Sequence, residues 1–540
     1  MKTAHLPGLL PTLLALSLCC GAAQAASTEH QEFEATLLAP FQAGAAQGRT
    51  FTLGFAYPGL ARADMVDWRL ELLRPDRRVA LRWHGQAALS GAPVTVAVPW
   101  SGRFGSAPAP DGIYTVRLRA SVRGDAHEVH EQEWEIAVGA PTAPVMPAFS
   151  PLPRPFEPAA VAAPGALPYT VYLGNLHSQT NHSDGGADLA ECKSGQSPLA
   201  SPHGPDAAFA YARGRGLDIL VTSEHNHMYD GSGGSAPNAN AAQARALYRA
   251  GLEAAAGFSR KHPGFLAVYG LEWGVINNGG HINIFNSDEL LGWETNAKGE
   301  LMADTATPRG DYAALYTLMR QRGWVGQFNH PAHSGQFQIG GEALAYTEDG
   351  GEAMALCEVM NSTAFSSRVD EGETRRSNYE TACNRLLEAG YRVAFSTNQD
   401  NHCANWGASF TNRTGVLLPN GVALDRASFV EALKARRVFA TMDKDSQLVL
   451  TANGRLMGER FDNRGPLTLV ASFANQKGRK AASVAIMEGV PGRKGTVTRL
   501  SERAETTFTP SPGAHFYYAK VTQDDGNVLW SAPVWVMQMD

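Results

Sequence analysis

The sequence predicts an α/β chain in which repeated βα units are flanked on both sides by β-sandwich domains. Residues 30–140, and those after about 441, alternate apolar and polar side chains with period two, which indicates strands. From about 169 to 440, short apolar runs alternate with helical stretches, which is typical of βα units. A chain of 540 residues that is 44% hydrophobic has room for several cores.

The first 25 residues have the pattern of a cleaved signal peptide. Lys2 gives a positive start, Leu9 to Leu18 is rich in leucine, and Ala23-Gln24-Ala25 fits a cleavage site of small residues. Lipid attachment at Cys19 or Cys20 is a less favoured alternative, because neither cysteine follows a small residue of the usual kind. No later run is apolar for long enough to span a bilayer. We therefore expect a periplasmic or secreted protein with no transmembrane segment.

Strand patterns also set the limits of the two outer domains. Segments such as "TFTLGFAY" and "IYTVRLRASV" predict an immunoglobulin-like sandwich over 26–140. The Pro- and Ala-rich residues 141–168 predict a semi-rigid linker. The βα units would occupy 169–440. Segments such as "SQLVLTANG" and "HFYYAKVTQDDG" predict a second sandwich over 441–540.

The charge of the chain limits the kind of partner. The formal net charge is −6, and neither sign forms a long run. Binding to nucleic acid requires clustered Lys and Arg against the phosphates. We therefore expect a small-molecule substrate and no nucleic acid, while the oligomeric state is left open.

Polar side chains follow strand after strand of the βα region. An imidazole or a carboxylate lies near each strand end, in "LHSQTNHSDGG", "VTSEHN", "GLEW", "GGHINIFN", "FNHP" and "STNQDNH". In a barrel of parallel strands these ends share one face, where active sites form. A single such residue is more often a turn residue, but the recurrence favours a shared site. Burying so many of them without a cation would be costly, and imidazole with carboxylate suits Zn, Mn or Fe.

The order of these motifs from about 170 to 440 resembles the PHP superfamily, named for polymerase and histidinol phosphatase. The signal peptide, the flanking β domains and the ending "YYAKVTQDDGNVLWSAPVWV" resemble its carbaryl-hydrolase branch. The resemblance implies a distorted (β/α)7 barrel, flanked by the two sandwiches, that carries two or three divalent metal ions.

The resemblance also implies three groups of metal ligands. These are His177, Glu272 and Asp400; Glu272, His281 and His330, with Glu272 bridging; and Asp184, His225 and His402. Gln179 stands where the family has a second histidine and would offer a weaker, neutral oxygen, so that the first site could be weak or empty. Glu224 replaces the family's aspartate and would orient its neighbours rather than bind.

Three further histidines have two interpretations each. His182 would contact a substrate or lie in a surface turn, and His227 would approach the third metal or face solvent. His333 would contact a phosphoryl oxygen or donate a proton, unless it is a plain loop histidine. We keep His333 and His182 as candidate catalytic residues.

Four cysteines follow the expected signal peptide: Cys192, Cys357, Cys383 and Cys403. An oxidising compartment permits disulfides among them, with three possible pairings. A Cys192–Cys403 bridge would tie the loop after the first motif to the rim of the site. A Cys357–Cys383 bridge and free buried thiols are the other possibilities.

The expected function is metal-dependent hydrolysis of a phosphate ester. Metal ions would lower the pKa of a bound water from about 15.7 toward about 7, and the hydroxide would attack in line. Hydrolysis of a carbamate, amide or carboxylic ester at the same metals is the first alternative. A catalytically inactive binding protein is the second, and Gln179 is the residue that keeps it open.

Overall fold

The computed structural model describes residues 33–44, 47–57, 60, 62–90, 92–124, 129–155, 167–275, 279–331 and 335–540. The signal peptide expected over 1–25 lies outside the described residues, and so does the 156–166 part of the expected linker. None of the helices in the described ranges has the length and the apolar run that crossing a bilayer requires.

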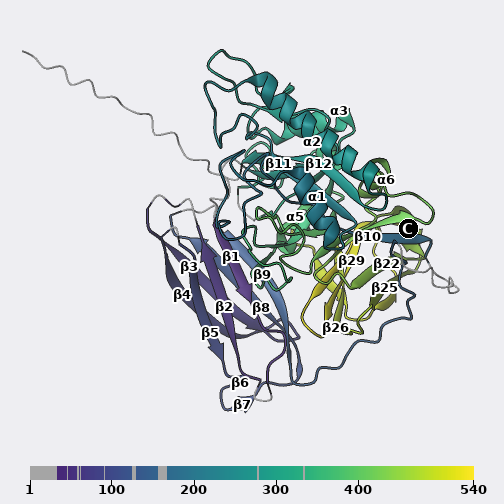
Figure 1. The fold of residues 1–540 in the computed structure, drawn as a ribbon. Helices are drawn as coiled ribbons and strands as arrows, with labels where there is room; N and C mark the ends of the chain where they lie inside the picture. Colours follow the sequence, from purple (N-terminus) through teal and green to yellow (C-terminus); the bar gives the residue numbers. More distant parts are fainter. Residues whose placement is uncertain are drawn as a thin grey trace, which may run out of the picture.

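Two larger antiparallel sheets and one two-stranded sheet form the N-terminal region, which lies beside the other two regions in Figure 1. Its strands are β1 (Glu34–Leu38), β2 (Arg49–Ala56), β3 (Asp64–Leu73), β4 (Val79–Leu89), β5 (Val94–Trp100), β6 (Arg103–Phe104), β7 (Ala107–Pro108), β8 (Gly112–Val122) and β9 (Val129–Val138). One larger sheet has the order β1-β2-β5 and the other β4-β3-β8-β9, while β6 and β7 pair only with each other. Phe51 from the first and Leu70 from the second are fully buried in one core, so the two sheets pack as a sandwich.

The middle region carries all the helices of the described chain. Its elements are β10 (Tyr169–Asn175), α1 (Pro205–Gly214), β11 (Ile219–His225), α2 (Ala241–Lys261), β12 (Leu266–Val275), β13 (Gly280–Ile284), β14 (Leu291–Gly292), β15 (Thr305–Ala306), α3 (Tyr312–Arg322), β16 (Gly326–Phe328), α4 (Glu348–Ala353), β17 (Met354–Ser362), β18 (Arg376–Asn378), α5 (Glu380–Ala389), β19 (Ala394–Asn398), β20 (Arg413–Pro419), α6 (Arg426–Lys434) and β21 (Val438–Thr441).

The C-terminal region is built from strands. They are β22 (Ser446–Ala452), β23 (Arg455–Leu456), β24 (Arg460–Arg464), β25 (Leu467–Asn475), β26 (Ala481–Gly489), β27 (Thr498–Ser501), β28 (Glu505–Phe508), β29 (Gly513–Gln523), β30 (Val528–Ser531) and β31 (Val534–Met539). One sheet has the order β23-β22-β25-β28, whereas β30, β29, β26 and β27 extend the sheet of the middle region through β21. Val171 and Leu448 accordingly lie in one core that spans both regions.

The (β/α)7 barrel expected for the middle region is wrong. The described residues are 42% strand and 14% helix. Apart from β14 and β15, which pair with each other, the middle strands lie in an open, mixed sheet of order β18-β17-β16-β13-β12-β11-β10-β20-β21. The strand β19 pairs with β17, and no ladder among the described strands joins it to β10 or β20 to close a ring.

Loop length explains part of this difference. A parallel pair needs a crossover of a dozen or more residues, and only residues 276–279 separate β12 from β13. The two strands therefore pair antiparallel, and β13 pairs antiparallel with β16 as well. Parallel pairing in the middle of the sheet is confined to β10–β11, β11–β12, β16–β17 and β17–β19.

Helix α2 packs so closely on β12 that one glycine is required at the contact. A Cβ atom at Gly251 would lie 2.1 Å from Cζ of Tyr269, whose side chain is fully buried. At Gly257 of the same helix, the nearest atom to an added Cβ is 3.9 Å away. The two glycines therefore differ in packing although both are helical.

We predict that Gly251→Ala lowers the free energy of unfolding by about 1–3 kcal/mol, since overpacking at a buried ring cannot relax. Gly257→Ala is the matched control and should raise it by about 0.5–1 kcal/mol through helix propensity. Urea unfolding followed by circular dichroism measures both. Equal effects of the two substitutions would contradict the close packing of α2 on β12.

Candidate metal centre

Eight of the predicted ligands come together near strand ends of the mixed sheet. We call this group the carboxylate–histidine cluster; its members are His177, Asp184, His225, Glu272, His281, His330, Asp400 and His402. Each is at most 7% exposed. They come from β11, β12 and β13 and from the loops after β10, β16 and β19. Ladder neighbours and adjoining loops thus bring together residues that are far apart in sequence.

The carboxylate of Glu272 lies at the centre of the cluster. Its Oε2 is 3.0 Å from Nε2 of His177 and 3.8 Å from Nδ1 of His225. Its Oε1 is 3.0 Å from Nδ1 of His281 and 3.5 Å from Nε2 of His330. One carboxylate thus faces four imidazoles, two through each oxygen, as a bridging ligand would.

Two aspartates complete the cluster. Oδ1 of Asp184 lies 3.2 Å from Nε2 of His402 and 3.6 Å from Nε2 of His225. Oδ1 of Asp400 lies 3.0 Å from Nε2 of His177. The separations resemble those of ligands that share one ion, which stand roughly 3–3.5 Å apart when each bond is about 2.0–2.2 Å.

The cluster contains three sets of residues, and within each set the ligand atoms lie within 4.8 Å of one another. They are His177, Glu272 and His330; His225, Glu272 and His281; and Asp184, His225 and His402. The last set has the same members as one expected group. The other two regroup the expected ligands around Glu272, and Asp400 joins them through its contact with His177.

Backbone hydrogen bonds join the loop after β10 to the loop after β19. The N–H of Gln179 donates to the carbonyl of Asn401 at 2.9 Å, and that of Gly186 donates to the carbonyl of His402 at 2.8 Å. A Cys192–Cys403 disulfide links the same two loops beside His402. The loop that carries Asp184 is therefore fixed against the loop that carries Asp400.

The second disulfide, Cys357–Cys383, joins β17 to α5. Both bridges that the sequence left open are thus present. Such bonds persist in oxidising compartments.

Two cluster residues have backbone conformations that are unusual for residues with a Cβ. The φ angle is 26° at His330 and 50° at Asp400. Positive φ at such residues costs about 1–3 kcal/mol and concentrates at functional sites. The N–H of His330 donates to Oε2 of Glu358 at 2.8 Å, which helps to hold this conformation.

Burial and neighbouring charges shift the pKa values of the cluster residues in opposite directions. Burial would lower the pKa of His177, but the charges of Asp400 and Glu272 raise it well above its usual 6.5. Burial would raise the pKa of Glu272, but the neighbouring histidines hold it well below 4.5. Burial would lower the pKa of His402, and Asp184 raises it to about 9. A divalent ion would take the place of these protons, because ligating histidines are neutral.

Gln179 brings a neutral side-chain amide to the cluster. Its Nε2 donates to Oε2 of Glu272 at 2.5 Å and to the carbonyl of Ser223 at 3.3 Å. Its buried Oε1 has no hydrogen-bond partner. A buried carbonyl oxygen without a partner is costly unless a cation or a donor meets it, so the residues present fit a metal site.

Glu224 does not contact the cluster directly. It accepts hydrogen bonds from the N–H and the hydroxyl of Thr180 and from the hydroxyl of Ser183. Burial raises its pKa to about 7. It therefore orders the loop that carries Gln179 and Asp184.

Of the three ambiguous histidines, His227 lies next to the cluster, with its ring centroid 6.0 Å from that of His225, and it is buried rather than facing solvent. Nδ1 of His182 is hydrogen-bonded to the hydroxyl of Tyr269 at 2.7 Å, and burial lowers the pKa of His182 to about 4. The ring of His227 stacks on Trp293 at 5.7 Å. His333 lies outside the described residues. The structure therefore does not bring His182 to the cluster.

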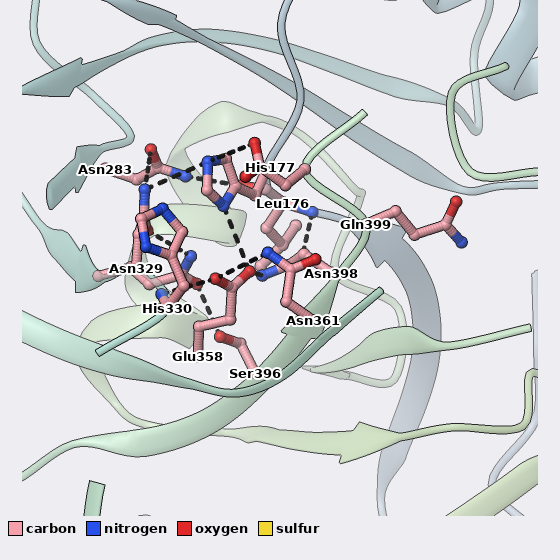
Figure 2. Close-up of polar contacts among 12 residues, drawn as sticks. Leu176, His177, Asn283, Asn329, His330, Glu358, Asn361, Ser396, Asn398 and Gln399 are labelled. Atoms are coloured by element: carbon pink, nitrogen blue, oxygen red, sulfur yellow. Dashed lines mark hydrogen bonds and ion pairs between the residues drawn. The ribbon is translucent and has the colours of Figure 1, made fainter. Parts of the chain in front are cut away.

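Glu358 is a site residue that the sequence interpretation missed. It lies fully buried on β17, and Figure 2 shows it pointing toward His177 and Asn398. Its Oε1 is 3.3 Å from Nδ1 of His177 and accepts a hydrogen bond from Nδ2 of Asn398 at 2.9 Å. The signal was a single charge inside the apolar run "MALCEVM", where charges are almost never buried without a partner.

Asparagine side chains also form hydrogen bonds that hold the carboxylates of the site. Nδ2 of Asn329 donates to Oε1 of Glu272 at 2.7 Å and to Oδ1 of Asn283 at 2.8 Å. Glu358 and Asn329 therefore fix the orientation of His177 and Glu272.

Neither a known family model nor a curated protein sequence matches the chain. The solved structures that resemble it include a glycosyl hydrolase family 2 member from Bacteroides cellulosilyticus, at 11% identity and a TM-score of 0.17, with 94% of this chain and 79% of that chain covered. They also include β-glucuronidase 2 of Bacteroides uniformis, at 11% identity, a TM-score of 0.15 and coverages of 94% and 61%. The β-glucuronidase of Parabacteroides merdae has 8% identity, a TM-score of 0.17 and coverages of 94% and 65%.

The expected membership of the PHP superfamily is corrected, because no family model matches the chain. The phosphoesterase activity, the carbamate, amide or ester alternative and the inactive PHP-fold binding protein are corrected with it. Unrelated folds can place the same metal-binding side chains in one site, so histidines and carboxylates near strand ends do not identify a family. TM-scores of 0.15 to 0.17 do not in turn assign glycosidase activity to this chain.

We predict that Glu358→Gln lowers the free energy of unfolding of the EDTA-treated protein by about 3 kcal/mol, because it breaks a buried ion pair with His177. Glu373→Gln is the matched control. Glu373 is 7% exposed but pairs with Arg375, whose side chain is 54% exposed. Losing that charge should cost less than the loss at Glu358, because the guanidinium of Arg375 stays in contact with water. Equal losses in urea unfolding would contradict the role of Glu358.

Proposed function

We propose that the carboxylate–histidine cluster binds two or three divalent metal ions, with zinc, manganese or iron as candidates, and that the chain is a metal-dependent hydrolase. One observation carries this proposal: the carboxylate of Glu272 faces four histidines through its two oxygens, with all five side chains at most 8% exposed. A site of this composition suits these metals. The free Oε1 of Gln179 would add a neutral oxygen ligand.

Metal ions bound in such a site lower the pKa of water and polarise the bond that is cleaved. The chain's own residues supply the arrangement. Glu272 joins the two halves of the cluster, and Glu358 directs Nε2 of His177 toward Glu272 and Asp400. The burial of these groups keeps bulk water out, which strengthens every charge interaction within the site.

The electrostatics of the cluster favour metal chemistry over a catalytic pair of carboxylic acids. Glycoside hydrolysis by two carboxyl groups needs one of them protonated, with a raised pKa. The neighbouring histidines hold the pKa of Glu272 and that of Glu358 below 4.5. Both are therefore suited to be ligands or orienting groups rather than proton donors.

Burial also limits the substrate. With every ligand at most 7% exposed, only a small molecule or a narrow end of a larger one reaches the cluster. The two disulfides support an oxidising, extracytoplasmic location for the enzyme.

We predict two to three zinc, manganese or iron ions per chain after loading, measured by inductively coupled plasma mass spectrometry. Glu272→Gln should reduce this to one or none and lower turnover at least about 100-fold, since losing a group of this kind typically costs at least 10–100-fold in metal affinity. Glu373→Gln, which removes a buried carboxylate elsewhere, should keep the wild-type metal content.

Turnover is measured on p-nitrophenyl glycosides, carboxylic esters and phosphates, with and without EDTA. Turnover that is lost with EDTA and restored by metal supports the proposal. Turnover that survives complete metal removal, including hydrolysis of a β-glucuronide, contradicts it. Full metal content without turnover of any of these substrates would contradict the proposed hydrolase activity but not the proposed metal binding.

A further inference from the structure

A large cavity lies where the three regions of the chain meet. Its volume is about 1170 Å³. Strands β8 and β9 of the N-terminal region, helix α5 of the middle region, and β26, β27 and β29 of the C-terminal region line it. No member of the carboxylate–histidine cluster lines this cavity. It is therefore a separate site, and nothing in the proposed hydrolysis uses it.

The charges that line the cavity balance. Six lysine or arginine and six glutamate side chains face it. Many of them are already paired: Arg77 makes two hydrogen bonds of 2.9 Å to Glu133, and Nζ of Lys520 lies 2.6 Å from Oε2 of Glu380. A charged ligand would have to break such pairs, whereas a neutral polar ligand would not.

The paired groups still offer hydrogen-bonding atoms to a ligand. A guanidinium has five N–H groups and a carboxylate has about four acceptor positions, so each pair leaves several unused. The side chain of Arg77 is 45% exposed and that of Glu133 is 26% exposed. A wall of neighbouring donors and acceptors matches a ligand rich in hydroxyl groups, because each hydroxyl both donates and accepts.

The cavity has a fixed shape. The carboxylate of Glu388 on α5 accepts the N–H groups of Gly495, Thr496 and Val497 at 2.9, 2.5 and 2.7 Å. Between the N-terminal and middle regions, Nδ2 of Asn378 donates to the carbonyl of Glu133 at 3.1 Å. The wall between the regions is therefore held in place before a ligand binds, which reduces the entropic cost of binding.

An aromatic ring lies at the edge of the cavity. Tyr346 is 43% exposed, and its ring packs edge to face on Tyr391 at 5.2 Å. Arg385, on the exposed side of α5, also lines the cavity. An amphipathic ring beside polar groups suits the apolar C–H face and the hydroxyl edge of a sugar.

We propose that this junction cavity binds a neutral, hydroxyl-rich ligand of oligosaccharide size. Its volume exceeds the roughly 300–1,000 Å³ of ordinary small-molecule sites, so that several sugar units fit. The balanced charges select against acidic and basic ligands, and the aromatic ring adds apolar contact.

The test is isothermal titration calorimetry on the full chain, EDTA-treated to exclude turnover. The probes are cello-, xylo-, malto- and chitohexaose, with hexagalacturonate and hexalysine as charged comparators. We expect at least one neutral hexasaccharide to bind. Tyr346→Ala and Arg385→Ala should each weaken that binding about tenfold, which corresponds to about 1.4 kcal/mol. Arg460→Ala, at an exposed arginine of β24 outside the cavity, should leave it unchanged.

The proposal is overturned if no neutral hexasaccharide binds, or if the Tyr346 and Arg385 variants bind as tightly as the wild type. Tighter binding of either charged comparator also overturns it. The sugar titrations use metal-free protein, so their outcome does not depend on whether the cluster binds metal. The two proposals can therefore be contradicted independently.

Discussion

The fully buried carboxylate of Glu272 is the group on which the middle region depends. Removing such a charge from water costs several kcal/mol, and only opposite charges and hydrogen bonds offset that cost. Those partners come from β11, β13 and the loops after β10 and β16. Strand register provides two of them: His225 lies directly opposite Glu272, and His281 lies opposite Gly274, two residues along the same face. A slip of one residue would turn these side chains to the other face of the sheet.

The members of the cluster could be predicted from the sequence, because most of them follow a short apolar run, His281 precedes one, and such runs are local signals. His177, His225 and His330 all stand at or just after strand ends, as expected. Glu358 was not found, since it lies inside an apolar run rather than after one, and only the fold places its partner His177 beside it. The two disulfides together make up one of the three possible pairings, and only spatial proximity in the fold selects it.

The architecture of the sheet was harder to predict, because it depends on pairings between distant segments. The segment "GGHINIFN" follows β12 too closely for a crossover, and β13 therefore runs antiparallel. Nothing local in β21 indicates that it pairs with β30, about 90 residues later, and so carries the sheet into the C-terminal region. The family assignment was wrong for a related reason. Motifs such as "FNHP" report the donor groups that a metal needs, and donor groups do not determine the fold around them.

The two proposed sites differ in how their charges are compensated, and this difference points to different ligands. In the carboxylate–histidine cluster, the acids face histidines that must lose their protons to act as ligands, so the cluster is negative whenever the histidines are neutral. Such a site selects a cation. In the junction cavity, Arg77 with Glu133 and Lys520 with Glu380 cancel one another before any ligand arrives. A cation or an anion gains little there, and hydrogen bonding to a neutral ligand is the interaction that remains.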